Sequence, residues 1–131
     1  MADWRPALAI VEKAYRGAVE TQFFDALYSA VELHRQLGGL EVLLRGAAAS
    51  YAVEAPPVPT LTIGGRIVDT LNDARHGLRA LLDAGVAVWV EEPGLAALGP
   101  HTRTRLVPGV RRVAAGELAG QWSTYRMVFF L

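Results

Sequence analysis

The chain has 131 residues, 52% of them hydrophobic, and its 13 basic residues balance 13 acidic ones. This length suits one domain, residues 1–131, with one core, and the apolar content argues against disorder. The balanced charge gives no electrostatic case for binding nucleic acid. No apolar run approaches the ~20 residues that a membrane span needs, and the N-terminus has no signal-peptide layout. We therefore expect a cytoplasmic protein that does not act at a membrane.

The residue types present exclude several kinds of chemistry. The chain has no cysteine, which excludes disulfides, thiol nucleophiles, persulfides and cysteine-ligated metals. Its one lysine is Lys13, and His34, His76 and His101 do not have metal-ligand spacing. Phosphate-loop, dinucleotide-binding and nucleophile-elbow glycine motifs are all missing. We therefore expect no metal and no cofactor.

The N-terminal third predicts a strand–helix–strand unit. Ala7–Glu12 is a short apolar run, typical of a buried strand. A helix is expected over Val19–Leu37, where apolar residues recur at steps of three and four, and Gly38-Gly39 ends it. Leu40–Arg45 is the second strand. A helix between two strands implies a parallel crossover.

Residues 46–69 are the least regular part of the sequence. Ala47–Tyr51 is long enough for one helical turn, and Thr60–Asp69 predicts a small hairpin that turns at Gly64-Gly65. The prolines between these segments exclude a continuous helix. A long loop in a small domain is typical of a lid or an interface.

The second half of the chain again alternates helices and strands. Its expected elements are a helix at Thr70–Ala84, a strand at Val86–Val90, a short helix at Leu95–Leu98, a strand at Val110–Ala114, a short helix at Glu117–Trp122 and a final strand at Tyr125–Leu131. Such alternation predicts an α/β fold, a three-layer α/β/α sandwich with a mainly parallel sheet of about five strands.

Ligands of open parallel sheets bind beyond the carboxyl ends of the strands, near the point where the strand order reverses. The loops expected at that edge, which we call the rim, carry the candidate ligand-binding residues Tyr15, Arg16, Arg45, Glu91, Glu92 and His101. Arginine suits carboxylates and phosphates, so the rim predicts a small anionic or polar ligand. Alternatively, the arginines pair with the glutamates, Glu20 among them, and only tie the loops together.

Other polar groups leave two interpretations open. Glu91 and Glu92 could form a coupled acid–base pair, but neighbouring residues at a strand end point to opposite sides. A basic cluster near the C-terminal end of the chain could attract an anionic partner or be solvated surface. Its members are Arg103, Arg105, Arg111 and Arg112.

Three segments resemble the DsrE/DsrF-like family. They are Leu81–Gly99, Leu106-Val-Pro-Gly-Val110 and Val128-Phe-Phe-Leu131. The resemblance implies the fold of that family and its trimers or hexamers. Sulfur-relay members carry a persulfide-bearing cysteine just after the third strand, where this sequence has Glu91. A carboxylate cannot carry sulfane sulfur, so the relay chemistry does not carry over.

Three functions remain compatible with the sequence. The first is a small-molecule or anion-binding module at the rim, and the second is an oligomeric scaffold or partner subunit. The third, and least favoured, is an enzyme with carboxylate or histidine acid–base chemistry, because no nucleophile–base pair is visible and no catalytic residue can be assigned. The apolar content, Trp89, Trp122 and the irregular 46–69 segment also predict a homo-oligomer.

Overall fold

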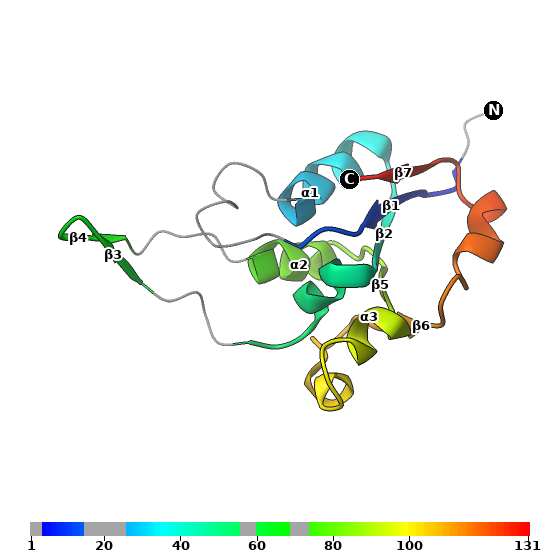
Figure 1. Ribbon diagram of the computed structural model, residues 1–131. Coiled ribbons are helices and arrows are strands. Elements are labelled where there is room, and N and C mark those ends of the chain that lie inside the picture. The colour runs from blue at the N-terminus through cyan, green and yellow to red at the C-terminus, as the bar shows by residue number, and fades with distance from the viewer. Residues whose placement is uncertain (1–3, 15–25, 56–59, 69–73) are drawn as a thin grey trace.

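A parallel sheet of five strands forms the centre of the molecule (Figure 1). The computed structural model describes residues 4–14, 26–55, 60–68 and 74–131. Its sheet consists of β1 (Ala7–Val11), β2 (Leu40–Leu44), β5 (Val88–Glu91), β6 (Arg111–Val113) and β7 (Val128–Phe130). The strands lie in the order β6-β5-β2-β1-β7, and every neighbouring pair is parallel. The predicted α/β fold with five parallel strands is confirmed.

The strand order reverses at β1. From β1 the chain moves outward through β2 and β5 to β6, and then returns to the other side of β1 with β7. The reversal therefore lies between β1 and β7. β1 and β2, which are adjacent, present nearly continuous apolar runs because both of their faces are covered.

Alternate residues of the strands enter two separate cores. Ala7, Ala9 and Val11 face the larger core, whereas Leu8 and Ile10 face the smaller one. The larger core is covered by α1 (Ala26–Leu37), α2 (Ala74–Asp83), the 3-10 helix η2 (Gly46–Ala52) and α3 (Glu92–Ala96). This face of the sheet carries most of the buried apolar surface, which stabilises the fold.

The opposite face of the sheet has a thinner cover. Leu118 and Tyr125, which flank the 3-10 helix η4 (Ala119–Thr124), pack on the smaller core with Val113. η4 itself buries no side chain. The sheet thus lies between two helical layers, as the predicted three-layer sandwich requires, but among the described residues the second layer consists of one short helix at one side (Figure 1).

A two-stranded hairpin stands apart from this body (Figure 1). β3 (Leu61–Ile63) pairs antiparallel with β4 (Arg66–Val68). Gly64 and Gly65, with φ of 57° and 78°, make the turn between them, a conformation that favours glycine. The predicted hairpin and its turn are confirmed.

Several predicted boundaries need correction. The short helix expected at Leu95–Leu98 is α3 and begins at Glu92, because Pro93 lies in its first turn, where proline suits a helix start. The short helix expected at Glu117–Trp122 is η4, two residues later. A 3-10 helix not predicted, η3, covers Thr102–Arg105. Residues 19–25 of the first predicted helix lie outside the described residues.

Candidate functional site

Three charged side chains form a row at the carboxyl edge of the sheet. In the registers of β1, β2 and β5, Val11 pairs with Leu44 and Leu44 pairs with Val90. The residues that directly follow Val11, Leu44 and Val90 in the chain are Glu12, Arg45 and Glu91, respectively. Because parallel neighbours keep their register, these three side chains are adjacent and project to the same face of the sheet.

Arg45 lies between the two carboxylates and contacts both. Its Nη1 is 3.1 Å from Oε1 of Glu12, and its Nε is 3.4 Å from Oε1 of Glu91. The backbone N–H of Gly116, in the loop after β6, donates to Oε2 of Glu91 at 3.3 Å. The side chain of Glu91 is only 9% exposed, whereas those of Arg45 and Glu12 are 41% and 46% exposed. Glu91 thus holds the row at its buried end, whereas Arg45 and Glu12 are accessible to solvent.

A cavity of about 600 Å³, here called the edge cavity, adjoins this row. It is lined by Glu12, Arg45, Gly46, Ala47, Glu91, Pro93, Gly94, Ala97 and Leu98. Gly94 of α3 is packed so closely on η2 that an added Cβ would lie 2.9 Å from the carbonyl oxygen of Gly46. A side chain there would force η2 and α3 apart, so the cavity wall depends on glycine at this position.

Of the predicted site residues, the structure brings Arg45 and Glu91 together. Glu92 projects to a different side, where its Oε1 lies 3.6 Å from Nε of Arg112. Glu91 and Glu92 therefore engage different partners, as the geometry of a strand end predicts, and the alternative of a coupled acid–base pair has no support in these contacts. His101 lines a second cavity and not the edge cavity.

Two of the predicted residues, Tyr15 and Arg16, lie outside the described residues, as does Glu20. The sequence analysis missed Glu12, because it was counted as the last residue of a strand. The register of the two predicted parallel strands could have indicated it. A charged residue that ends an apolar strand beside Arg45 can pair with the guanidinium of that arginine.

The described members of the predicted basic cluster do not form a single patch, and the side chain of Arg103 lies outside the described part of the structure. Arg112 pairs with Glu92, the guanidinium of Arg111 lies 5.2 Å from the centre of the Trp89 ring, and Arg105 lines the second cavity. Arg111 and Arg112 have different partners because successive strand residues face opposite sides of the sheet, and Arg105 belongs to η3 and not to the strand.

A second polar cluster lies on the thinly covered face of the sheet. Trp89 Nε1–H and the hydroxyl of Tyr125 both donate to Oε1 of Glu41, each at 2.9 Å. Burial, and then the neighbouring Glu41 carboxylate, raise the pKa of Tyr125 well above its ordinary value. This cluster fixes η4 to β2 and β5 and lines neither of the two cavities.

The edge cavity offers hydrogen-bonding and charge groups rather than a nucleophile. Among its described lining residues, the polar side chains are those of Glu12, Arg45 and Glu91, with a formal charge of −1. Arginine has five N–H donors, and only two of those of Arg45 face the carboxylates.

Within the described ranges, no three histidine, aspartate or glutamate side chains gather where they could hold a metal ion. No described helix is long and apolar enough to cross a membrane.

These features define a class: a small α/β protein with a five-stranded parallel sheet and, at the carboxyl edge, a cavity that three charged side chains line in part. Within that class, the chain is similar in structure to the YchN protein from E. coli, a DsrE/DsrF-like fold protein. The TM-score is 0.73 at 19% sequence identity, and the likeness covers 97% of this chain and 99% of that one. It shows the fold that the DsrE/DsrF-like resemblance implied. No family model matches the sequence, and no curated protein matches it either.

Proposed function

We propose that the protein is a DsrE/DsrF-like protein without persulfide chemistry that binds a small polar molecule in the edge cavity. One observation carries the proposal: Glu12, Arg45 and Glu91 form a charged row at the ends of three adjacent parallel strands, beside a cavity of about 600 Å³. The carboxyl edge is where parallel sheets bind their ligands, although this cavity lies beside β1, β2 and β5 and not at the reversal between β1 and β7. A volume in the range of about 300–1,000 Å³ suits a small molecule.

The charges of the row favour one kind of polar ligand. A simple anion would meet Arg45 already flanked by two carboxylates. A molecule with both a donor and an acceptor fits better, since it can donate to the exposed carboxylate of Glu12 and accept from the remaining N–H groups of Arg45. Zwitterions that carry an ammonium and a carboxylate group have this pattern.

Calorimetric titration with free glycine and β-alanine as zwitterions, and with sulfate and inorganic phosphate as simple anions, tests the proposal. We expect saturable zwitterion binding that weakens about tenfold in Arg45→Ala and in Glu12→Gln, because each loses one charge-assisted hydrogen bond. Simple anions should bind more tightly to Glu12→Gln than to the wild type, since that variant removes a repelling charge.

Arg35→Ala is the matched control. Arg35 is an exposed arginine on α1 that pairs with Glu32 at 3.3 Å, far from the lining of the edge cavity. This variant should bind the zwitterions as the wild type does. Undetectable binding to the wild type, or equal binding to the wild type, Arg45→Ala and Glu12→Gln, would contradict the proposal.

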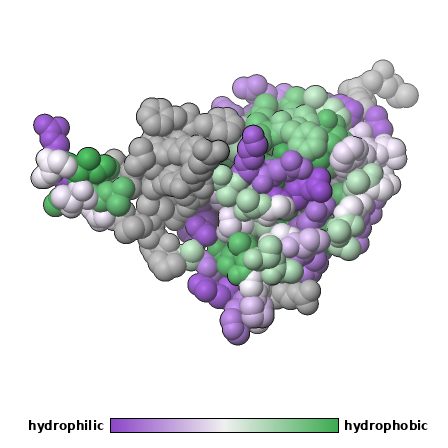
Figure 2. Space-filling view, viewed as in Figure 1, coloured by the Kyte–Doolittle hydropathy of each residue, from purple (hydrophilic) through white to green (hydrophobic). Residues whose placement is uncertain are grey.

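A second proposed property, self-association, is supported by the exposed apolar surface. Ile63 and Ile67 of the hairpin are 55% and 73% exposed, and Phe130 of the edge strand β7 is 61% exposed. Figure 2 shows apolar side chains on the projecting hairpin and a second apolar patch where β7 ends. An isolated two-stranded hairpin is marginally stable in water, so we propose that a second copy of the chain covers its apolar side chains. Light scattering should then give a multiple of 14.1 kDa, and the family resemblance implies a trimer or a hexamer.

A further inference from the structure

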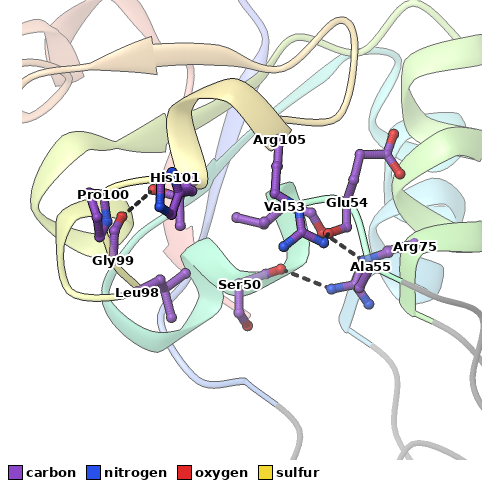
Figure 3. Close-up of a pocket in the computed structure, with 11 residues that line it drawn as sticks. Ser50, Val53, Glu54, Ala55, Arg75, Leu98, Gly99, Pro100, His101 and Arg105 are labelled. Atoms are coloured by element: carbon purple, nitrogen blue, oxygen red, sulfur yellow. Dashed lines mark hydrogen bonds between the residues drawn. The ribbon is translucent and has the colours of Figure 1, made fainter.

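A second cavity, of about 400 Å³, lies beside the edge cavity and is called the loop cavity here. It is formed by η2, the loop after α3, η3 and the start of α2, and its lining includes Ser50, Arg75, Leu98, His101 and Arg105 (Figure 3). Leu98 also lines the edge cavity, so the two cavities are neighbours that share one apolar lining residue. Nothing in the proposed function uses the loop cavity.

Basic side chains dominate the charge of the loop cavity. Arg75, Arg105 and His101 line it, and Glu54 is its one described acidic lining residue. The carboxylate of Glu54 is directed away from these guanidinium groups and toward α2, where Oε2 lies 3.8 Å from Nη2 of Arg79 (Figure 3). Glu54 meets Arg105 through its backbone carbonyl oxygen, which accepts a hydrogen bond from Nη2 of that arginine. The cavity therefore presents positive charge to whatever enters it.

The arginines are positioned by backbone carbonyls. Arg75 donates from Nε to the carbonyl oxygen of Val53 at 2.9 Å and from Nη2 to that of Ser50 at 3.2 Å. Arg105 donates from Nη2 to the carbonyl oxygen of Glu54 at 3.2 Å. Among the described residues, Arg105 has no carboxylate partner, unlike Arg45. Its charge is thus oriented but not neutralised, which suits recognition of an oxyanion.

The two segments that carry these groups are fixed to each other. Val53 and Leu106 form an antiparallel bridge, and the backbone N–H of Glu54 donates to the carbonyl oxygen of Arg105 at 2.6 Å. The buried hydroxyl of Thr102 shares its one proton between the carbonyl oxygens of Leu95 and Gly99, each 3.0 Å from Oγ1. These bonds hold η3 in place, so the cavity exists before any ligand arrives, which lowers the entropic cost of binding.

We propose that the loop cavity binds a small organic anion, with its carboxylate or phosphate group at Arg105 and its apolar body against the apolar wall. That wall is formed by Val53, Ala55, Leu98 and Pro100. The head group accepts hydrogen bonds from the guanidinium of Arg105 and from an imidazole N–H of His101, which lies on the opposite side of the cavity (Figure 3). The site is separate from the edge cavity, and its ligand class differs from the zwitterion proposed there.

Titration of the full chain with benzoate, phenyl phosphate and inorganic phosphate tests this proposal. We expect saturable binding of one or both aromatic anions, and which of them binds more tightly identifies the head group. Inorganic phosphate should bind at least about fivefold more weakly than phenyl phosphate, because it has no apolar body. Equal binding of these two phosphates would overturn the assignment of an organic ligand.

Variants of the cavity locate the binding. Arg105→Ala should weaken binding about tenfold, and Arg105→Lys less, because lysine keeps the charge but loses the planar fork. His101→Gln should weaken binding about threefold. Because His101 is exposed, this variant should fold normally, so it tests the cavity even if the Arg105 variants misfold. Arg35→Ala, at an exposed arginine that lines neither cavity, should bind like the wild type. No saturable binding to the wild type, or weakening by Arg45→Ala but not by Arg105→Ala, would overturn the proposal.

Discussion

At the scale of single residues, Glu41 explains how the thin second layer is held on the sheet. Its carboxylate lies among apolar neighbours on β2 and accepts hydrogen bonds from Trp89 and Tyr125 at 2.9 Å. Glu41 is half-buried, and these donors replace the part of its hydration that burial removes. Here the two donors come from β5 and from the residue after η4, so the bonds also join separate parts of the chain.

Replacing Tyr125 by phenylalanine tests this cluster. The pKa of Tyr125 is raised above 10.0 in the folded protein, chiefly by burial and then by Glu41, so the neutral phenol is favoured on folding. Its stabilisation is fully present below about pH 10 and is lost as the pH rises above the unfolded value toward the folded one. Tyr125→Phe should lower the unfolding free energy by about 1.5 kcal/mol at neutral pH, and urea unfolding should show a smaller loss of stability above pH 10.

Two substitutions at Glu91 separate its charge from its hydrogen bond. Glu91→Ala removes the partner of both Arg45 and the Gly116 N–H from a buried position, so we expect a loss of about 1–3 kcal/mol. Glu91→Gln keeps an acceptor for Gly116 and should lose less than half of that. Urea unfolding measures both. Glu32→Ala, at an exposed pair, should change stability by no more than about 0.5 kcal/mol. A loss in Glu91→Gln as large as in Glu91→Ala would contradict this.

At the scale of elements, the contact between α1 and α2 depends on Gly77. A Cβ added there would lie 3.0 Å from Cβ of Leu27 and 3.1 Å from the backbone nitrogen of Tyr28. Backbone atoms of α1 cannot move aside cheaply, so the helices would have to separate. Gly77 therefore sets how closely α2 approaches α1, and with it the position of Arg75 in the first turn of α2.

Gly77→Ala should consequently destabilise the protein, although alanine favours helices more than glycine by about 1 kcal/mol. We expect overpacking to outweigh that gain and to lower the unfolding free energy by about 1–3 kcal/mol. Thermal and urea unfolding give the measurement. Gly120→Ala is the control, since nothing lies within 4 Å of a Cβ added to that residue of η4. It should be neutral or slightly stabilising. A stabilised Gly77→Ala variant would show that the helices can separate freely.

Element types were easier to predict from the sequence than element limits. The apolar run before Glu12 and the Gly64-Gly65 turn each carry a strong local signal, and both elements were predicted correctly. α3 begins at Glu92, three residues before the predicted start at Leu95, because the proline at position 93 favours the first turn of a helix. Short 3-10 helices such as η3 have weak local signals and depend on contacts like those of Thr102.

The candidate site shows the same division between local and long-range information. Arg45 and Glu91 were predicted because each follows a strand and parallel strands end at one edge. The loop cavity was not predicted, since Arg75 and Arg105 are thirty positions apart and meet through the bridge between Val53 and Leu106. An isolated bridge between two irregular segments has no periodic sequence pattern, so the sequence indicated a basic cluster for Arg105 and no role for Arg75.

At the scale of the whole molecule, the sites and the apolar surface occupy different regions. Both cavities lie near η2 and α3, whereas the exposed isoleucines belong to the hairpin and Phe130 belongs to β7. In Figure 2 the hairpin projects from the body and the patch at β7 is on another part of the surface. Self-association through the hairpin and the β7 edge would therefore leave both cavities accessible, so binding and assembly can be tested independently.

Ile67→Lys tests the assembly through the hairpin. Ile67 is 73% exposed, so the variant should barely change the stability of a single chain. Burial of an isoleucine between copies contributes about 1.5–3 kcal/mol, and a lysine in its place should therefore weaken association at least tenfold. Light scattering across a concentration series should show Ile67→Lys moving toward 14.1 kDa, while Ile67→Val keeps the wild-type mass.

Phe130→Lys should also lower the mass of the assembly if β7 completes the interface. A wild-type protein of 14.1 kDa at micromolar concentration, or an Ile67→Lys protein with the wild-type mass at every concentration, would contradict assembly through the hairpin.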